Sequence, residues 1–446
     1  MSDYLLNLSG NPFARKMIKQ LKLPVPLPQN LSRSKRAWEE TPLKGRKFAM
    51  GSASESAFES EIEGILKDAG ATPAAGETRA DALIFDGTGL KTPKDLTQLY
   101  DFFHSHVRNV KACCHMVVVG FNGDTLSDPV AAATHKGLLG FIKSLAKETG
   151  KKGITANLIQ LESGTVPVAN LIGPLVYFLS HRSAFISGQS LSVGEGQPHS
   201  NGWAGSLSGQ YAIVTGAAQG IGKAIAKCLA AEGARVIGID HPGAKDKLKS
   251  AMQEIDGKAW SFDLMKEESC KAIVDKLNAE NIKPSILVNN AGITRDKTIA
   301  RMDNKKWSET IQLNLNQVMN LSEALLKDCF ADDGRIINIS SIGGIAGNMG
   351  QTNYATSKSG VIGYTRARSA TLKKQRMNAI APGFIETRMT AAMPVAVREV
   401  ARRFNALSQA GAPKDIGDAV TFMAMPQSFG VSGQTLRVCG LNLIGA

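Results

Sequence analysis

Three motifs from the first half of the chain recur in the second half, in the same order. The pairs are HKGLLGFIKSLAKE (135 onward) with KSGVIGYTRARSAT (358 onward), NLIQLE (157 onward) with NAIAPG (378 onward), and ISGQSLSV (186 onward) with VSGQTLRV (431 onward). Self-similarity of this kind is the sequence mark of a duplicated structural unit. A chain of 446 residues is also too long for one ordinary hydrophobic core. We therefore predict two related domains in tandem.

The domain boundaries follow from local composition. The stretch PHSNGWAGSLSG at 198–209 is rich in Gly, Ser and Pro and poor in apolar residues, which is typical of a linker. Near the N-terminus, FARKMIKQLKLPVPLP predicts a short amphipathic helix followed by a Pro-rich arm. We predict an N-terminal arm at 1–40, a first domain at 41–200 and a second domain at 207–446.

The second half alternates short β-branched runs with segments of helical period. The runs are YAIVTG, ARVIGID, SILVNNAG, GRIINISS and MNAIAPG. They are typical of buried parallel strands between amphipathic helices. This order predicts a doubly wound α/β sheet. The predicted fold is therefore two Rossmann-like doubly wound parallel sheets in tandem, of which the first is degenerate and flavodoxin-like in appearance.

Charge and hydropathy argue against a nucleic-acid or membrane protein. The net charge is +13, but the basic residues are spread out, without a long Lys/Arg run or the spacing of a helix-turn-helix or zinc finger. Such a surface can still attract a phosphate-bearing cofactor or an acidic carrier protein. No apolar run reaches the roughly 18 residues of a membrane span. The N-terminus lacks the pattern of a secretory signal, so we expect a cytoplasmic protein.

One cluster has the composition of a metal site: His104, His106, Cys113, Cys114 and His115. However, CCHMVVVG reads as a strand, on which neighbouring side chains point to opposite faces. The six cysteines of the chain form no CxxC pair and lie mostly in apolar segments, as buried reduced thiols do. We predict no metal site.

A glycine-rich turn opens the second half. YAIVTG runs into AAQGIGKAIAKCLA, which places Gly216, Gly220 and Gly222 between a strand and a helix. Glycines there let the backbone approach a pyrophosphate, although packing alone is the alternative reason for them. Asp240 ends a strand about 20 residues further on, where an acid binds a ribose 2′-hydroxyl and repels a 2′-phosphate. We predict binding of NAD(H), with NADP(H) less favoured. Three lysines nearby in the sequence weaken this preference: Lys223, Lys245 and Lys247.

Tyr354 and Lys358 are four residues apart, so on a helix they share one face. Two unit charges about 4 Å apart at an effective dielectric of about 20 interact by roughly 4 kcal/mol, or about three pKa units. The lysine is therefore able to lower the pKa of the tyrosine towards neutrality, where a general acid works best. Taken alone, the pair is also explained as a surface helix contact. Ser341 at the end of RIINISS and Asn314 in IQLNLNQVMNL favour a catalytic set.

These motifs identify the second half as resembling a short-chain dehydrogenase/reductase. TGAAQGIG, NNAGITRD, NYATSKSG and IAPGFIETRMT are similar to the 3-oxoacyl-[acyl-carrier-protein] reductase branch of that family. The two-domain layout resembles its high-molecular-weight form. The resemblance covers the chain from about Leu207 to Ala446, whereas the first half resembles only a decayed relative.

The resemblance implies a role for each of the four candidates. Tyr354 would give a proton to the ketone oxygen while the nicotinamide delivers hydride to its carbon. Lys358 would lower the pKa of Tyr354 and hold the nicotinamide ribose. Ser341 would donate a hydrogen bond to the carbonyl oxygen, and Asn314 would anchor a water that returns protons to Lys358.

The resemblance also implies contacts to the cofactor and the acyl chain. The cofactor residues are Gly216, Gln219, Gly220, Ile221 and Gly222 at the turn, Asp240 at the ribose, Asp263 and Leu264 at the adenine, Asn290, Ala291 and Gly292 beside the adenine ribose, Tyr354 and Lys358, and Pro382, Gly383, Ile385 and Thr387 on the nicotinamide side. Thr390 to Gln409 would form a mobile helical lid over the acyl chain.

The implied activity is NADH-preferring reduction of 3-oxoacyl thioesters in fatty acid metabolism. Two departures weaken the acyl-carrier-protein assignment and leave acyl-CoA open: TLKKQRMNAIAPG is shorter than its first-half counterpart, and Asp332 and Asp333 stand near where carrier-docking reductases often have basic residues. One alternative is a 3-hydroxyacyl-CoA dehydrogenase running oxidatively. Another is a dinucleotide-binding sensor or scaffold with little turnover.

The first half lacks the catalytic residues. In the repeat alignment, Ala131 and His135 stand where Tyr354 and Lys358 stand in the second half. Its counterpart of the glycine-rich turn, AMGSASESAF, contains an acid that repels a pyrophosphate. We expect no turnover there. The Gly137 to Gly140 helix is intact, and in this family that helix packs against its copy from another subunit. We therefore predict a homodimer of two-domain chains that mimics a tetramer.

Overall fold

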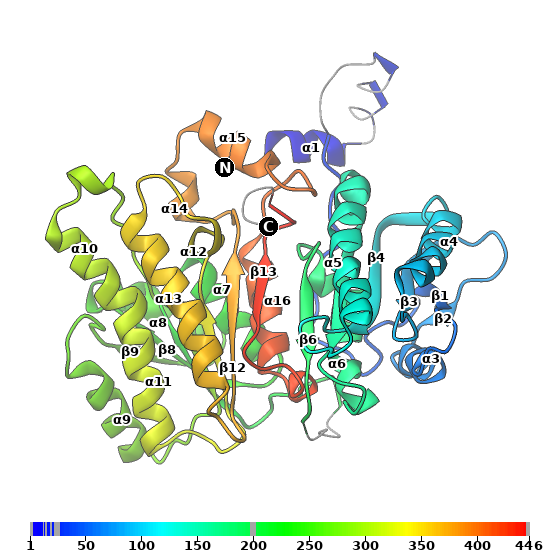
Figure 1. The fold of residues 1–446 in the computed structure, drawn as a ribbon. Helices are drawn as coiled ribbons and strands as arrows, with labels where there is room; N and C mark the ends of the chain where they lie inside the picture. Colours follow the sequence, from blue (N-terminus) through cyan, green and yellow to red (C-terminus); the bar gives the residue numbers. More distant parts are fainter. Residues whose placement is uncertain are drawn as a thin grey trace. The chain divides into compact units, whose positions relative to one another are not determined.

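The structure, a computed structural model, describes residues 3–11, 13, 16, 17, 20, 21, 27–196 and 202–442. It divides into two compact units (Figure 1). Unit 1 comprises Met1–Gln197, Arg388–Gly411 and Cys439–Leu443, and unit 2 comprises Pro198–Thr387, Ala412–Val438 and Ile444–Ala446. The amphipathic helix predicted from FARKMIKQLKLPVPLP lies largely outside the described residues.

Unit 1 is built on a six-stranded parallel sheet in the order β2-β1-β3-β4-β5-β6. Its strands are β1 Lys47–Ser52, β2 Thr72–Pro73, β3 Ala80–Asp86, β4 Val110–Phe121, β5 Thr155–Leu161 and β6 Ser190–Val193. Its helices are α1 Tyr4–Gly10, α3 Glu59–Asp68, α4 Leu96–His106, α5 Pro129–Thr149, α6 Ile172–Leu179, α14 Arg388–Ala391 and α15 Val395–Arg403. The central strands are apolar on both faces because helices cover both faces of such a sheet. Leu83, Met116, Val118 and Leu158 are fully buried in its core.

Unit 2 has a seven-stranded parallel sheet in the order β13-β12-β11-β10-β7-β8-β9. Its strands are β7 Tyr211–Thr215, β8 Arg235–Asp240, β9 Lys258–Ser261, β10 Ile286–Asn289, β11 Arg335–Ile339, β12 Arg376–Pro382 and β13 Thr435–Val438. Its helices are α7 Gly220–Ala231, α8 Lys245–Gln253, α9 Ser269–Ala279, α10 Asn304–Ile311, α11 Gln317–Asp328, α12 Ile342–Ala346, α13 Thr352–Ser369 and α16 Pro413–Ala424. Ile213, Ile237, Leu287 and Met377 are fully buried in its core.

The two sheets share one topology. The order β2-β1-β3-β4-β5-β6 corresponds strand by strand to β8-β7-β10-β11-β12-β13, and unit 2 adds β9 at one edge. The repeated motifs fall on equivalent elements, since they pair α5 with α13, β5 with β12 and β6 with β13. The prediction of two doubly wound parallel sheets in tandem is therefore confirmed. That the first is degenerate stays a prediction.

Two segments of the second half group with the first half in unit 1. Arg388–Gly411 and Cys439–Leu443 belong to unit 1, although the sequence places them within the second half. These two segments bond to each other and to the first half. The Ala406 amide donates to the Gly440 carbonyl over 3.0 Å, and the Gly440 amide donates to the Phe185 carbonyl over 2.9 Å. The division into arm, first domain and second domain stays a prediction.

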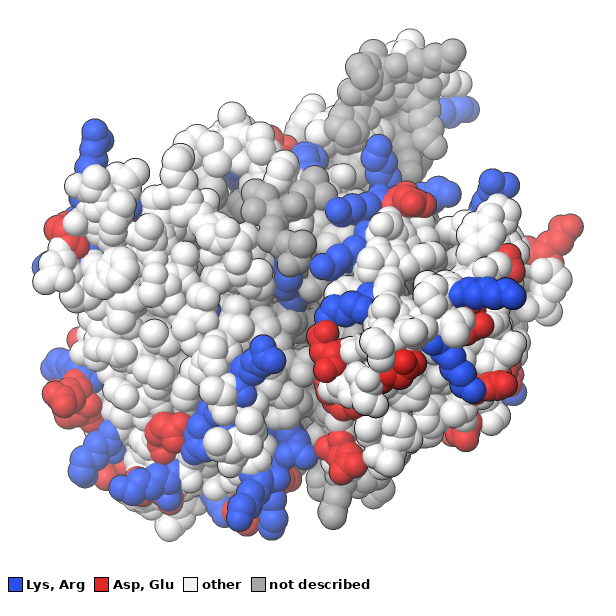
Figure 2. Space-filling view, in the orientation of Figure 1, with Lys and Arg blue, Asp and Glu red and all other residues white. Residues whose placement is uncertain are grey.

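Charge is unevenly distributed over the visible face of unit 2. Figure 2 shows few charged side chains over α13, whereas Lys, Arg, Asp and Glu gather towards the lower end of this unit. Across the described ranges, no helix has the length and hydropathy to cross a bilayer.

The cysteines and histidines that the sequence groups at 104–115 lie in unit 1. Cys113 and Cys114 are both buried. Cys113 has a φ of 59°, in the part of β4 where the pairing with β3 shifts register. Among the residues that the structure describes, no three His, Cys, Asp or Glu side chains are grouped to hold a metal ion.

Candidate active site

The candidate residues of unit 2 follow the carboxyl ends of its central strands. β7 leads into the turn at Gly216, β10 into Asn290, β11 into Ser341 and β12 into Gly383. In an open α/β sheet, this edge is where ligands bind. The fold therefore brings segments that are far apart in the sequence to one functional edge.

Helix α13 carries Tyr354 and Lys358 one turn apart. Lys358 Nζ lies 5.8 Å from the centroid of the Tyr354 ring. Lys358 is 4% exposed, and its ammonium donates to the Ile339 carbonyl over 2.8 Å. Because Ile339 is the last residue of β11, this bond fixes the lysine head at the end of the central strand.

Ser341 begins α12 and faces Tyr354. The Ser341 hydroxyl caps the helix by accepting a hydrogen bond from the Gly343 amide over 3.1 Å. The serine side chain also hydrogen-bonds to the Tyr354 side chain. A Cβ atom added at Gly343 would lie 3.4 Å from Ser341 Oγ and 3.8 Å from Tyr354 Cε1. The serine and tyrosine hydroxyls thus converge beside a position without a side chain.

Asn314 lies in a π-helical segment, Gln312–Asn316, between α10 and α11. Its side-chain oxygen accepts from the Ile293 amide and its side-chain nitrogen donates to the Ile293 carbonyl, both over 2.9 Å. The same nitrogen donates to Ser357 Oγ over 3.2 Å. Single π-turns inside helices often mark functional sites. The sequence did not predict this turn, because the local helical period is unbroken.

Gly292 lies between Asn314 and Lys358. A Cβ atom there would lie 3.0 Å from Asn314 Oδ1 and 3.4 Å from Lys358 Nζ. Asn314 and Lys358 therefore meet at the loop after β10, and Tyr354 and Ser341 follow next to Lys358. Sequence reasoning missed two supporting residues, Ile339 and Ser357, whose only signal was that they adjoin predicted site residues.

Burial governs the protonation of the tyrosine and the lysine. Burial lowers the pKa of Lys358 to about 8. It raises the pKa of Tyr354, while the hydrogen bond from Ser341 acts in the opposite direction and the charge of Asp296 adds to the rise. The sequence argument predicted a lowered pKa for Tyr354, and the structure reverses this direction. That argument counted the attraction of the ammonium but not the removal of the phenolate from water.

The glycine-rich turn has the close backbone packing that its glycines predict. Gly216 and Gly220 have φ values of +67° and +58°. A Cβ atom at Gly222 would lie 2.0 Å from the Gly216 carbonyl oxygen, which no side chain allows. Asn290 Nδ2 donates to the Thr215 carbonyl over 2.9 Å and to the Gly216 carbonyl over 3.3 Å. The turn and the loop after β10 therefore form one rigid cradle.

The comparisons with known proteins concern this second half. A family model described as enoyl-(acyl carrier protein) reductase matches residues 216–440, which is half of the chain. A 3-oxoacyl-[acyl-carrier-protein] reductase FabG from Vibrio cholerae is 40% identical over 237 residues, 52% of this chain and 97% of that relative. The chain belongs to the short-chain dehydrogenase/reductase family.

Other members of the family match the same half. The FabG proteins from Thermotoga maritima and Escherichia coli are 39% identical over 242 residues and 38% identical over 237 residues. These matches cover 98% and 97% of the relatives and 52% of this chain. This family member is therefore an oxidoreductase.

The acid after β8 is held at the glycine-rich turn of this short-chain dehydrogenase/reductase. Asp240 Oδ2 accepts from the Ala218 amide over 2.9 Å, and Oδ1 accepts from the His241 amide over 2.8 Å. Each carboxylate oxygen has a further lone pair, so the group still has acceptors for a ribose diol. Lys223, which weakened the predicted preference, bonds to Glu254 over 2.6 Å. Lys227 bonds to the same carboxylate over 2.6 Å, and the two lysines lower the pKa of Glu254 to about 2, so one carboxylate offsets only one of the two lysine charges.

The remaining predicted cofactor residues lie along the same edge. Gln219 directly precedes α7, which contains Ile221, and the Ala291 amide donates to Thr215 Oγ1 over 3.0 Å. Asp263 Oδ1 accepts from the Met265 amide over 3.0 Å, and Leu264 is 8% exposed.

Pro382 ends β12, the Gly383 amide donates to the Val438 carbonyl over 2.9 Å, and Ile385 is buried. Thr387 is the last residue before the chain enters unit 1. The tight backbone turn at Gly216 to Gly222, followed by Asp240 after β8, fits a dinucleotide.

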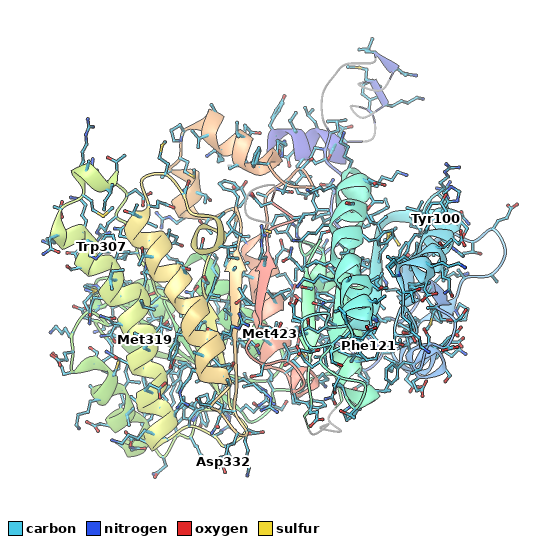
Figure 3. All side chains as sticks on the ribbon, viewed as in Figure 1. Tyr100, Phe121, Trp307, Met319, Asp332 and Met423 are labelled. Atoms are coloured by element: carbon cyan, nitrogen blue, oxygen red, sulfur yellow. The ribbon has the colours of Figure 1, made fainter. Side chains whose placement is uncertain are left out.

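Asp332 is remote from this edge. It precedes β11 and forms an ion pair with Lys283 over 3.6 Å. Figure 3 shows Asp332 at the lower end of unit 2, below the long helices. Asp332 therefore lies at the end of the sheet opposite to the catalytic candidates, and its effect on docking of a carrier protein stays a prediction.

Proposed function

We propose that this protein uses NADH to reduce 3-oxoacyl thioesters to 3-hydroxyacyl thioesters in the cytoplasm. The observation that carries the proposal is the convergence of the Ser341 and Tyr354 hydroxyls beside the buried ammonium of Lys358. The relatives named 3-oxoacyl-[acyl-carrier-protein] reductase support the substrate class.

The catalytic roles follow from the positions of the polar groups. A bound reduced nicotinamide supplies a hydride to the ketone carbon. Tyr354 gives the proton that the developing alkoxide needs, and Ser341 donates a second hydrogen bond to the same oxygen. Because the pKa of Tyr354 is raised, its hydroxyl keeps its proton until the alkoxide forms.

Lys358 and Asn314 serve the return of the proton. Lys358 has a pKa of about 8, so it exchanges protons readily near neutral pH. Its hydrogen bond to Ile339 keeps the ammonium at the strand end. From there it would hold the nicotinamide ribose. Asn314 fixes the loop at Ile293 beside the lysine. We propose that it also binds a water molecule that returns a proton to Lys358.

NADH preference rests on Asp240. Its carboxylate stands at the glycine-rich turn, where a 2′-phosphate would add a second negative charge nearby. Lys223 shares the Glu254 carboxylate with Lys227, so only part of the positive charge there is offset. His241 follows Asp240 directly and its side chain is 64% exposed, so it is an alternative contact for a phosphate.

We propose that unit 1 does not turn over substrate. Asp86 ends β3, the strand equivalent to β10, and its carboxylate accepts from the amides of Phe58 and Thr88 over 3.2 and 3.0 Å. Phe58 directly precedes α3, so an internal carboxylate already occupies the helix start where a phosphate would sit. A Cβ atom at Gly89 would lie 2.3 Å from the Ser54 carbonyl oxygen, so the loops at this edge are closed on each other.

We further propose that two chains associate as a homodimer. The lightly charged face over α13 in Figure 2 is suited to such packing, since charged residues are depleted at the core of an interface. The thioester carrier is either acyl carrier protein, as in the names of the relatives, or CoA, which carries its own phosphates.

The test is NADH oxidation with acetoacetyl-CoA and with acetoacetyl-acyl carrier protein, alongside NADPH. We expect turnover with NADH, and a loss of about a thousandfold in Tyr354→Phe. Reduction of crotonyl-CoA instead would favour the enoyl reductase described by the family model. Faster oxidation of 3-hydroxybutyryl-CoA by NAD⁺ at physiological cofactor ratios would favour a dehydrogenase. NADH binding without any turnover would favour a sensor.

A further inference from the structure

Helix α13, which carries Tyr354 and Lys358, begins in an unusual way. Gln351 directly precedes the helix, and within the described part of the chain its side chain makes no capping hydrogen bond to the first turn. The first amides of a helix have no partner inside the helix, so another group has to accept from them. Here the Asn353 side chain takes part of this role, since its Oδ1 accepts from the Tyr354 amide over 2.8 Å.

The equivalent helix of unit 1, α5, begins with a local cap. The Asp128 carboxylate accepts from the Val130 and Ala131 amides over 3.2 and 3.0 Å. Val130 stands in the repeat alignment where Asn353 stands in unit 2, and it is 47% exposed. A helix at this place in the fold therefore forms without a buried asparagine, so the start of the helix alone does not explain Asn353.

Asn353 is fully buried and bonds to two other elements of unit 2. Its Nδ2 donates to the Arg295 carbonyl, in the loop after β10, over 3.2 Å. It also reaches two acceptors on α10, the Lys306 carbonyl over 3.2 Å and Thr310 Oγ1 over 3.1 Å. Thr310 is itself fully buried, and its hydroxyl donates to the Lys306 carbonyl over 2.8 Å. One side chain therefore joins the start of α13 to the loop after β10 and to α10.

The neighbouring contacts of α13 differ in their exposure to water. Gln351 Nε2 donates to Asp296 Oδ2 over 2.8 Å, but this bond is exposed. The Lys358 carbonyl accepts from Ser340 Oγ over 2.7 Å, and this bond is buried. A buried hydrogen bond is electrostatically stronger than one in water. The first turn of α13 therefore lies between two buried attachments, one at Asn353 and one at Lys358.

We propose that Asn353 is a positioning residue that holds the Tyr354 hydroxyl opposite Ser341 for proton transfer, an inference that rests on the proposed function. Asn353 acts through the tyrosine and needs no contact with the reacting atoms. Because the two residues are adjacent, a rotation of this turn would carry the phenol away from the serine to which it hydrogen-bonds. A displacement of about 1 Å at a reacting group is enough to slow a reaction about a hundredfold.

The experiment compares Asn353→Asp with wild-type full-length protein. The aspartate keeps the side-chain shape and still accepts from the Tyr354 amide, but an ionised carboxylate has no hydrogen to donate to the Arg295 and Lys306 carbonyls. We expect kcat for the reduction of acetoacetyl-CoA by NADH to fall about a hundredfold. The KM of acetoacetyl-CoA and the Kd of NADH should stay within about twofold, because only the transition state needs the aligned phenol.

Asn378→Asp is the matched control. Asn378 lies on β12 and is 1% exposed. Its Nδ2 donates to the Val431 carbonyl over 2.9 Å, and its Oδ1 accepts from the Gln434 amide over 3.0 Å. The same substitution there also buries a carboxylate against a carbonyl, so it should lower Tm. Its kcat per folded molecule should stay that of the wild type, which separates the cost of a buried charge from positioning.

A milder pair of variants changes only one acceptor of Asn353. Thr310→Val keeps the side-chain shape but removes the hydroxyl, whereas Thr310→Ser keeps the hydroxyl and removes the methyl group. We expect kcat to fall about fivefold in Thr310→Val, the effect of one neutral hydrogen bond, and to return to nearly the wild-type value in Thr310→Ser. This pair decides the question if Asn353→Asp does not fold.

Several results would overturn the proposal. An unchanged kcat in folded Asn353→Asp would show that the asparagine does not position the tyrosine. An equal loss of kcat in Asn378→Asp would show a general effect of a buried charge. Equal losses in both Thr310 variants would assign the effect to packing of the methyl group. If the wild type turns over neither acetoacetyl-CoA nor acetoacetyl-acyl carrier protein, the proposed function itself fails, whereas an active wild type with unaffected variants overturns only the positioning role.

Discussion

His135 accepts a hydrogen bond from the Phe121 amide over 3.1 Å. Phe121, labelled in Figure 3, is the last residue of β4 in unit 1. In unit 2 the equivalent helix position is Lys358, which donates to the Ile339 carbonyl at the end of β11. Both side chains therefore join a helix to the last residue of a central strand, with donor and acceptor exchanged. In unit 1, where we propose that no catalysis occurs, this helix position therefore still bonds to the end of the central strand.

We expect His135→Leu to destabilise the protein without lowering kcat. The leucine leaves the Phe121 amide without its acceptor, a loss of about 1–3 kcal/mol in the free energy of unfolding. Urea unfolding monitored together with NADH oxidation measures both effects. A fall in kcat that exceeds the fraction unfolded would contradict a purely structural role.

The same residue predicts a pH dependence of stability. Burial lowers the pKa of His135, so the unfolded chain binds more protons than the folded chain below about pH 6.5. The stability due to neutral His135 is complete above that pH and is lost as the pH falls towards the folded-state pKa. Urea midpoints between pH 5 and pH 8 should therefore fall less steeply on acidification in His135→Leu than in wild type. Parallel curves would show that His135 does not titrate in this range.

Lys358→Met should abolish turnover and yet stabilise the protein at neutral pH. The pKa of Lys358 is about 8, against about 10.4 in an unfolded chain, so burying the charge costs on the order of 3 kcal/mol below pH 8. As the pH rises from 8 to 10.4, the unfolded chain loses protons that the folded protein has already released, and this cost disappears. The gain in Tm of the variant should therefore be largest at pH 7 and shrink by pH 10. Lys327→Met, at an exposed position, is the control, and a variant less stable than wild type at pH 7 would contradict the expectation.

Gly222→Ala should abolish dinucleotide binding. The added Cβ atom would lie 2.0 Å from the Gly216 carbonyl oxygen, so the turn must open and the amides that face the pyrophosphate move. We expect the Kd of NADH, measured by fluorescence titration, to rise at least about a hundredfold, with a lower Tm. Tight NADH binding by the variant would place the cofactor elsewhere.

Asp240→Asn should shift the choice of cofactor towards NADPH. The amide removes the charge that repels a 2′-phosphate and weakens the bond to the Ala218 amide. We expect the ratio of kcat/KM for NADH over NADPH to fall by about ten- to a hundredfold, the effect of 1.4 to 2.8 kcal/mol. Asp246→Asn, at an exposed position nearby on α8, is the control. An unchanged ratio would move the discrimination to another residue, with His241 the first to test.

Much of the site was predictable because it depends on local sequence. The turn at Gly216, Gly220 and Gly222 needs residues without side chains, and the spacing of these glycines in the sequence predicts it directly. Tyr354 and Lys358 share a face because a helix repeats every 3.6 residues. The repeated motifs likewise predicted two related parallel sheets, since each motif carries the hydrophobic pattern of its own strand or helix.

Other features depend on contacts between residues far apart in the chain, and only the tertiary structure decided them. Residues 388–411 group with unit 1, and Arg403 bonds to Asp3 and Gln409 to Gln29, which are pairings between opposite ends of the sequence. The direction of the Tyr354 pKa depends on how much water the folded protein removes from the phenol, which residue spacing does not determine. Local sequence therefore determined the elements and their chemistry, whereas long-range packing decided which unit holds each segment and how strongly each charge is buried.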